Sequence, residues 1–183
     1  YINGHSDVIG GAVILNDQAV YERIRLVQKS VGAVPSPFDS WLTLRGLKTL
    51  AIRLKQHELN AFAVARHLKN IPKVTEVFYP GLEEHPGHAI AKKQMTGFGG
   101  VVSFRIEGGL NEANAFFRKL RIFQLADSLG GVESLANYPA IMTHGAFPAG
   151  LRKKIGVTDN LIRLSVGIEH IDDLLVDLEN AFK

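Results

Sequence analysis

The sequence contains no cysteine, and this absence removes several kinds of chemistry at once. Disulfide bonds, thiolate nucleophiles and cysteine-ligated zinc are all excluded from these 183 residues. Long apolar runs are also lacking, because no stretch approaches the roughly 20 residues that a membrane-spanning helix needs. We therefore expect a cytoplasmic protein that does not use a membrane as a partner.

The sequence also lacks a large excess of positive or negative charge. The 21 lysines and arginines oppose 18 acidic residues, which leaves a net charge of only +3. The basic residues are scattered, so nucleic acid is not an expected partner. None of the seven histidines has metal-ligand spacing such as His-Glu-x-x-His, and no metal site is predicted.

What the sequence does contain is the apolar periodicity of an α/β fold with helices on one face of a sheet. Residues 8–15 are small and apolar, which is typical of a strand buried on both faces. Further strands are expected at residues 74–79, 100–107, 121–125 and 161–168. Helices are expected at residues 18–30, 39–69 with an interruption near Gly46, 88–95, 111–120 and 171–182.

Arg163 is the first candidate functional residue. Because side chains alternate along the strand, Arg163 lies on the face opposite to Ile162 and Leu164, which should pack on helices. A buried guanidinium needs an anionic partner. That partner is either a substrate carboxylate, which the planar guanidinium binds with two hydrogen bonds, or an internal Asp or Glu, which is the more common arrangement.

The second candidate is the loop of residues 126–135, which is rich in glycine and serine. Small residues after a strand let backbone amides approach an anion closely. The alternative is a tight turn at Gly130 with serines as capping residues. His144 is a possible general base, although we expect His144 and His5 to be structural.

Five blocks of the sequence resemble the cystathionine γ-lyase and γ-synthase family of pyridoxal-phosphate (PLP) enzymes in order and spacing. The blocks together cover nearly the whole chain. They are Tyr1–Gly11, Val34–Leu50, Tyr79–Leu82, Ser128–Leu135 with Pro139–His144, and Leu161–Glu169.

The resemblance implies an α/β fold of the PLP-dependent transferase type I, which is aspartate-aminotransferase-like. Residues 1–51 would end the large PLP-binding domain, and residues 52–183 would form the C-terminal small domain. The resemblance also implies a homotetramer with active sites shared across dimers and a small amino-acid substrate. The chain would be a segment of a larger polypeptide, in which the Schiff-base lysine that holds pyridoxal 5'-phosphate lies immediately before Tyr1. No catalytic residue would then lie in this segment.

The same resemblance assigns roles to five residues. Arg163 would bind the substrate α-carboxylate, with Ser128 and Leu129 beside it, Ser128 assisting through its backbone. Asp127 stands where many relatives carry Glu at the entrance of the substrate pocket, so its shorter side chain would affect selectivity. Tyr1 would contact the cofactor.

Within the family, Val34–Thr43 and Thr143–Gly145 favour a γ-lyase, which cleaves L-cystathionine to cysteine, 2-oxobutanoate and ammonia. The alternative is a γ-synthase, which joins O-acyl-homoserine and cysteine. Methionine γ-lyase is disfavoured, because such relatives usually have a small apolar residue in place of Asp127 and lack the glycines at 130 and 131. An alternative of another class is a non-catalytic module that binds a small anion through Arg163 and residues 127–134.

Overall fold

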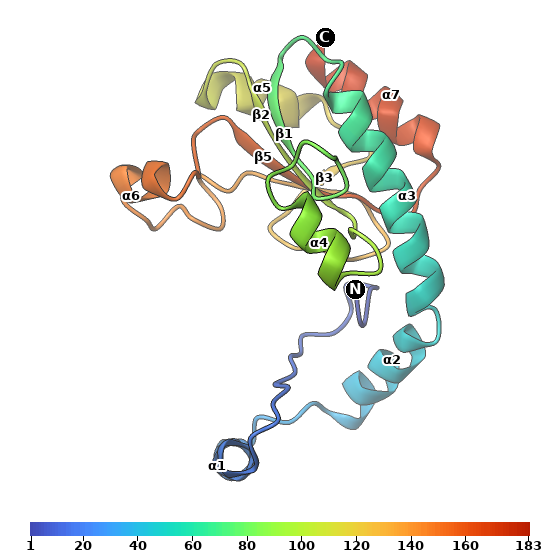
Figure 1. Ribbon diagram of the computed structural model, residues 1–183, viewed down its shortest axis with the longest axis vertical. Coiled ribbons are helices and arrows are strands. Elements are labelled where there is room, and N and C mark those ends of the chain that lie inside the picture. Colours follow the sequence, from blue (N-terminus) through green and yellow to red (C-terminus); the bar gives the residue numbers. More distant parts are fainter. The chain divides into compact units, whose positions relative to one another are not determined.

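The computed structural model describes residues 1–183, which form two compact units. One unit is residues 2–50, and the other contains Tyr1 and residues 51–183 (Figure 1). The helices are α1 (Gln18–Val31), α2 (Pro37–Leu47), α3 (Leu50–Leu68), α4 (His88–Gln94), α5 (Leu110–Lys119), α6 (Ala149–Lys154) and α7 (Ile171–Phe182). The strands are β1 (Val74–Phe78), β2 (Val101–Ile106), β3 (Gln124–Leu125), β4 (Leu135–Asn137) and β5 (Leu161–Ser165).

The two helices α1 and α2 begin at the capping residues that their sequences contain. The carboxylate of Asp17 accepts a hydrogen bond from the amide of Val20 at 2.9 Å. The Ser36 hydroxyl accepts a hydrogen bond from the amide of Asp39 at 3.0 Å, in the first turn of α2. The helix predicted over residues 39–69 is interrupted at residues 48–49, close to the predicted break at Gly46.

The buried strand predicted for residues 8–15 is wrong. The segment has no regular secondary structure, and the side chains of Ile9 and Ile14 are 101% and 93% exposed. A strand needs neighbours that pair with its backbone amides and carbonyls, and no other segment of residues 1–183 pairs with this one. Apolar composition alone therefore does not make a strand here.

The sheet of the larger unit has the strand order β1-β2-β5-β4-β3. Neighbouring strands in this sheet are antiparallel, except that β3 and β4 are parallel to each other. The short strand β4 and the short helix α6 were not predicted. The strand predicted to reach residue 168 ends as β5 at Ser165, so Ile168 is 37% exposed instead of packing on the helices.

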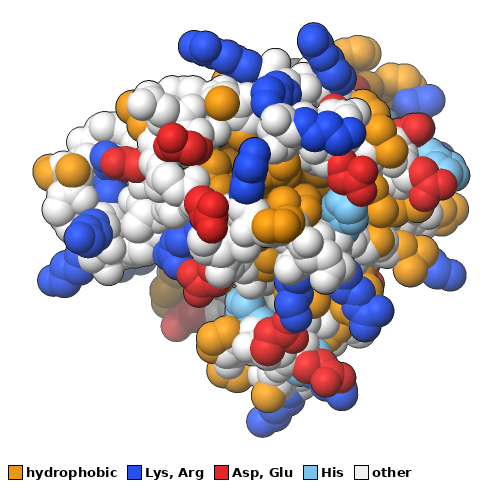
Figure 2. All heavy atoms as spheres, turned by 90° about the horizontal axis from the view of Figure 1, so that it is seen from above, with side chains coloured by type: hydrophobic (Ala, Val, Ile, Leu, Met, Phe, Trp, Pro, Cys, Tyr) orange, Lys and Arg blue, Asp and Glu red, His pale blue; other side chains and the backbone are white.

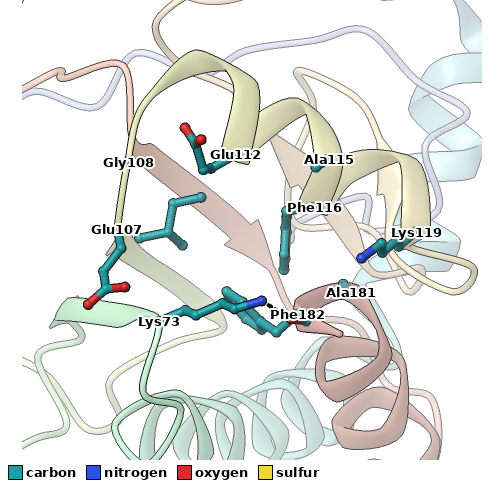
Figure 3. Close-up of a pocket in the computed structure, with 10 residues that line it drawn as sticks. Lys73, Glu107, Gly108, Glu112, Ala115, Phe116, Lys119, Ala181 and Phe182 are labelled. Atoms are coloured by element: carbon teal, nitrogen blue, oxygen red, sulfur yellow. Dashed lines mark hydrogen bonds between the residues drawn. The ribbon is translucent and has the colours of Figure 1, made fainter.

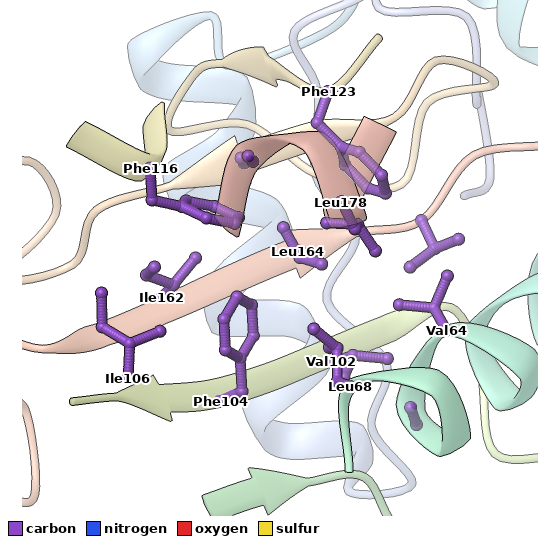
Figure 4. Close-up of a cluster of buried hydrophobic side chains, with 14 of the residues drawn as sticks. Val64, Leu68, Val102, Phe104, Ile106, Phe116, Phe123, Ile162, Leu164 and Leu178 are labelled. Atoms are coloured by element: carbon purple, nitrogen blue, oxygen red, sulfur yellow. The ribbon is translucent and has the colours of Figure 1, made fainter. Parts of the chain in front are cut away.

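The core lies between one face of this sheet and helices α3, α5 and α7, as the alternation predicted (Figure 4). Phe104 of β2 packs edge-on against Phe116 of α5 at 5.8 Å between ring centroids, and Ile162 and Leu164 of β5 are fully buried beside them. Each such side chain contributes roughly 1.5–3 kcal/mol through burial. The opposite face of β5 is thereby left to carry polar groups.

Asp177 of α7 connects the helical layer to the start of β3. Its buried carboxylate accepts three hydrogen bonds, from the backbone amides of Arg121, Ile122 and Phe123, at 2.8, 2.9 and 3.0 Å. Charge-assisted bonds of this kind are among the stronger hydrogen bonds in proteins. They hold the backbone that leads through β3 into residues 126–134.

Candidate functional site

Arg163 lies in the middle of the sheet, on strand β5. It is directly opposite Ser103 of β2 and Asn137 of β4 in the register of the sheet. As predicted, its side chain is on the face opposite to the buried Ile162 and Leu164. The guanidinium is therefore outside the apolar core, and it is half-buried.

Neutral carbonyl groups hold this guanidinium in place. Its Nη2 donates to the backbone carbonyls of Asp127 and Ser128, each at 3.1 Å. No Asp or Glu forms an ion pair with Arg163, so the internal salt bridge considered from the sequence is not formed. The Nε atom is buried without a hydrogen-bond partner. Burial lowers the pKa of Arg163, and the nearby Asp127 partly opposes this effect.

The loop that supplies these carbonyls is anchored to the strand that carries Arg163. The amide of Gly130 donates to the hydroxyl of Ser165 at 2.8 Å, and Ser165 is two residues from Arg163 on the same face. After the loop, the amide of Ile168 donates to the carbonyl of Val132 at 2.9 Å. The loop and the strand therefore form one hydrogen-bonded assembly.

Glu169 fastens the far end of the loop. Its carboxylate accepts from the amide of Ser134 at 2.7 Å and from the hydroxyl of Ser134 at 2.8 Å. The same hydroxyl accepts from the amide of Gly167 at 2.8 Å. Asn60 of α3 donates to the carbonyls of Gly167 and Glu169 at 3.0 and 2.9 Å.

Tyr1 belongs to the same unit and lies beside this loop. Its carbonyl accepts from Nη1 of Arg53 at 2.9 Å, and its phenol oxygen accepts from the amide of Gly100 at 2.9 Å. A Cβ atom on Gly130 would lie only 2.8 Å from the backbone nitrogen of Tyr1. Burial raises the pKa of the Tyr1 phenol. The backbone nitrogen of Tyr1 therefore faces the loop at Gly130, whereas its phenol oxygen is hydrogen-bonded to Gly100.

The structure thus brings together Tyr1, the loop containing Asp127, Ser128 and Leu129, and Arg163. The three loop side chains are exposed, and Leu129 is 48% exposed. The roles of all five residues stay predictions.

The two histidines expected to be structural both have local partners. Nδ1 of His144 pairs with the hydroxyl of Thr143 at 2.9 Å, and its ring contacts Phe147 at 5.6 Å. Nδ1 of His5 lies 2.7 Å from the carbonyl of Asn3. Neither histidine shows a hydrogen bond to Arg163 or its loop.

Three anchoring residues were missed by sequence reasoning, namely Ser165, Glu169 and Arg53. Ser165 could have been found from the alternation that placed it on the face of Arg163. Glu169 and Arg53 carried no such signal, because their partners are 35 and 52 residues away in the chain.

A separate hollow of about 270 Å³ lies between β2, α5 and the end of α7 (Figure 3). Phe116 and Phe182 line it together with Lys73, Lys119, Glu107 and Glu112. None of the predicted site residues lines it, and its charges of both signs select no particular ligand.

Basic and acidic side chains are interspersed on the face drawn in Figure 2, so this face has no large patch of one charge. No group of three His, Asp or Glu side chains is placed to hold a metal ion. None of the helices has the length and apolar character needed to cross a membrane.

Comparison with known proteins agrees with the resemblance seen in the sequence. The chain is 54% identical over 183 residues to cystathionine γ-lyase of Mus musculus, covering 100% of this chain and 46% of that protein. It is 55% identical over 181 residues to cystathionine γ-synthase of Mycobacterium tuberculosis, covering 99% of this chain and 46% of that protein. The chain therefore spans about half the length of the curated relatives it matches.

Solved structures give the same result. The crystal structure of cystathionine γ-synthase from Xanthomonas oryzae pv. oryzae in complex with cystathionine superposes with a TM-score of 0.94 at 50% identity, over 100% of this chain and 47% of that one. This likeness confirms the predicted PLP-dependent transferase type I fold. The family described as Cys/Met metabolism PLP-dependent enzyme matches residues 1–183 in full. Because the match extends over every residue, the chain belongs to the family of Cys/Met metabolism PLP-dependent enzymes.

Proposed function

We propose that the chain is the C-terminal part of a cytoplasmic PLP-dependent enzyme that cleaves the Cγ–S bond of L-cystathionine. The reaction consumes water and gives cysteine, 2-oxobutanoate and ammonia. Residues 1–51 would end the large cofactor-binding domain, and residues 52–183 would form the small domain. The division of the chain between residues 50 and 51 supports this boundary, although Tyr1 groups with residues 51–183.

The observation that carries the proposal is that Arg163 has unused hydrogen-bond donors and no ion-pair partner. No carboxylate of the chain forms an ion pair with it, and Nε is buried without a hydrogen-bond partner. The two backbone carbonyls hold only Nη2, so other N–H groups remain for an anion. A substrate α-carboxylate supplies an anion of matching planar geometry. Arg163 would thus fix the amino acid at one end.

Tyr1 is the residue through which this chain would contact the cofactor. The backbone nitrogen of Tyr1 lies against Gly130, so the preceding residue would enter beside the loop that Arg163 holds. The lysine that we expect there would bind PLP, and Tyr1 would contact it. When bound, PLP withdraws electrons from Cα of the amino acid and so makes its bonds easier to break.

The chain's own residues would orient the substrate. Arg163 would hold the α-carboxylate, and Ser128 and Leu129 would line the same end of the pocket. Holding the reacting bond in the productive orientation lowers the barrier by several kcal/mol in favourable cases. Asp127, which is exposed at the loop, would face the distal ammonium group of cystathionine and contribute to selectivity.

The second candidate is a cystathionine γ-synthase, which forms cystathionine from O-acyl-homoserine and cysteine. The Mycobacterium tuberculosis and Xanthomonas oryzae relatives carry that name, which supports it. Assays of the full-length protein decide between the two. Release of 2-oxobutanoate and cysteine from cystathionine supports the lyase, whereas release of pyruvate would indicate cleavage of the Cβ–S bond instead. Activity only on O-acyl-homoserine with cysteine would overturn the lyase assignment.

Borohydride reduction of the full-length protein tests the cofactor assignment independently of the substrate. Mass spectrometry of peptides should place the pyridoxyl adduct on a lysine immediately before Tyr1. Absence of an adduct would favour a non-catalytic anion-binding module. Light scattering of the same sample should give the mass of a homotetramer, since we propose active sites shared across dimers.

A further inference from the structure

Tyr1 is held by a cluster of buried residues that the proposed reaction does not itself require. The guanidinium of Arg53 is 5% exposed and donates to the carbonyl of Tyr1. The amide of Gly100 donates to the phenol oxygen, 99 residues away in the chain. The ring of Tyr1 contacts that of His57, with 5.0 Å between centroids. Carbonyl, phenol and ring are thus each fixed by a different contact.

Two glycines show how closely the surrounding backbone approaches Tyr1. A Cβ atom on Gly100 would lie 2.9 Å from the phenol oxygen and 3.0 Å from Cβ of His57. Gly130 has φ +78°, a left-handed conformation, and the backbone nitrogen of Tyr1 occupies the space where its Cβ would lie. A side chain at Gly100 would clash with the phenol of Tyr1, and one at Gly130 would clash with its backbone nitrogen.

His57 forms the inner wall of this cluster, and its surroundings favour the neutral ring. It is fully buried, and its Nδ1 lies 2.6 Å from the carbonyl of Val166. Because a carbonyl can only accept, Nδ1 carries the proton of the neutral ring. Burial lowers the pKa of His57, and the neighbouring Arg53 lowers it further, although the Val166 carbonyl acts in the opposite direction. Burial and the Arg53 guanidinium thus both favour the uncharged ring.

We propose that Arg53, His57 and Gly100 form a clamp on Tyr1 that sets the direction in which the preceding residue enters the site. This inference depends on the proposed function, in which that residue is the lysine that binds PLP. Tyr1 follows the lysine directly, so a shift of its carbonyl or nitrogen is transmitted through one peptide unit. Arg53, His57 and Gly100 are positioning residues, because they act on the lysine through Tyr1.

The test uses Arg53→Met and Arg53→Gln in the full-length protein. Methionine keeps an unbranched apolar stem but cannot donate to the Tyr1 carbonyl, whereas glutamine retains a donor. Two measurements report on the lysine without turnover: the pH titration of the absorbance of bound PLP, and the rate at which added amino acid displaces the lysine. Losing the hydrogen bond to the Tyr1 carbonyl, worth about 1 kcal/mol, should slow displacement by roughly five- to tenfold in Arg53→Met and shift the pKa of the absorbance change. Arg53→Gln should restore part of both.

The matched control is Lys55→Met, which removes an exposed cation two residues along the same helix. Binding of butyrate, a carboxylate without an amino group, should be equal in all variants, because Arg163 is untouched. If Arg53→Met matches Lys55→Met in both measurements, the clamp is wrong. Should Arg53→Met fail to fold, Tyr1→Phe decides, because it keeps the ring but removes the hydroxyl that accepts from the Gly100 amide, and it should shift the same titration. Absence of a lysine adduct in the unmodified protein would overturn the proposed function itself.

Discussion

At the scale of single residues, the orientation of Arg163 was predictable but its partners were not. Alternation along residues 161–168 placed the guanidinium opposite to Ile162 and Leu164, and the structure confirms it. Whether an Asp or Glu stood nearby depended on the conformation of residues 126–134. In that loop two backbone carbonyl groups accept hydrogen bonds from the guanidinium, and no carboxylate forms an ion pair with it.

The role of Arg163 can be separated from folding by kinetics. We expect Arg163→Ala to raise KM for cystathionine about 30- to 150-fold, which corresponds to roughly 2–3 kcal/mol for a charge-assisted pair. The absorbance of bound PLP should not change, because the proposed role is in substrate binding. Steady-state assays and spectra of the full-length protein measure both, and loss of the cofactor spectrum would contradict the assignment. Arg163→Lys is the control that keeps the charge without the planar guanidinium.

His57 should make the larger unit less stable in acid. Its folded-state pKa is lowered, so the unfolded chain binds a proton more readily, and stability is lost as the pH falls below about 6.5. Urea unfolding of His57→Gln should show a shallower fall between pH 6.5 and 5 than the unsubstituted chain, by up to one proton. His170→Gln, at an exposed position, serves as the control. Equal slopes in all three proteins would contradict a buried neutral His57.

At the scale of elements, the ends of helices were predicted better than strands. The final helix was expected at residues 171–182, which is where α7 lies, because one apolar stripe defines its length. The strand expected at residues 8–15 is absent, since pairing requires partners from other segments. Strand β4, only three residues long, is too short to produce a recognisable alternation.

Asp177 connects two such elements, and its loss should be costly. Asp177→Ala leaves three backbone amides at residues 121–123 without their acceptor. We expect the free energy of unfolding to fall by about 3–5 kcal/mol, as for other broken buried networks. Urea denaturation measures this, with Asp173→Ala on the exposed side of the same helix as the control. A loss below about 1 kcal/mol would show that water replaces the carboxylate.

At the scale of the whole molecule, the two units should differ in protection from hydrogen exchange. None of residues 8–15 takes part in a backbone hydrogen bond, whereas residues 102–104 and 162–164 lie in the centre of the sheet. In the isolated chain, amides of the first segment should exchange within seconds and those of the second orders of magnitude more slowly. Mass spectrometry of peptides after deuterium labelling tests this. Slow exchange at residues 8–15 would contradict the conformation seen here.

The same experiment on the full-length protein bears on the proposed domain assignment. If residues 1–51 end a large cofactor domain, other segments of that domain should pair with residues 8–15 and protect them. Continued fast exchange there would contradict the assignment, although the family membership, which comes from the whole chain, would stand.

By itself the sequence determined the family, the periodic elements and the face of Arg163, because all three depend on local patterns or on blocks of residues read in order. Only the tertiary structure decided which groups surround that arginine, how Glu169 and Ser165 anchor the loop, and where Tyr1 lies. Those contacts join residues 35 to 99 positions apart. A local sequence pattern cannot predict contacts between residues so far apart, since only the folded backbone brings them within hydrogen-bonding distance.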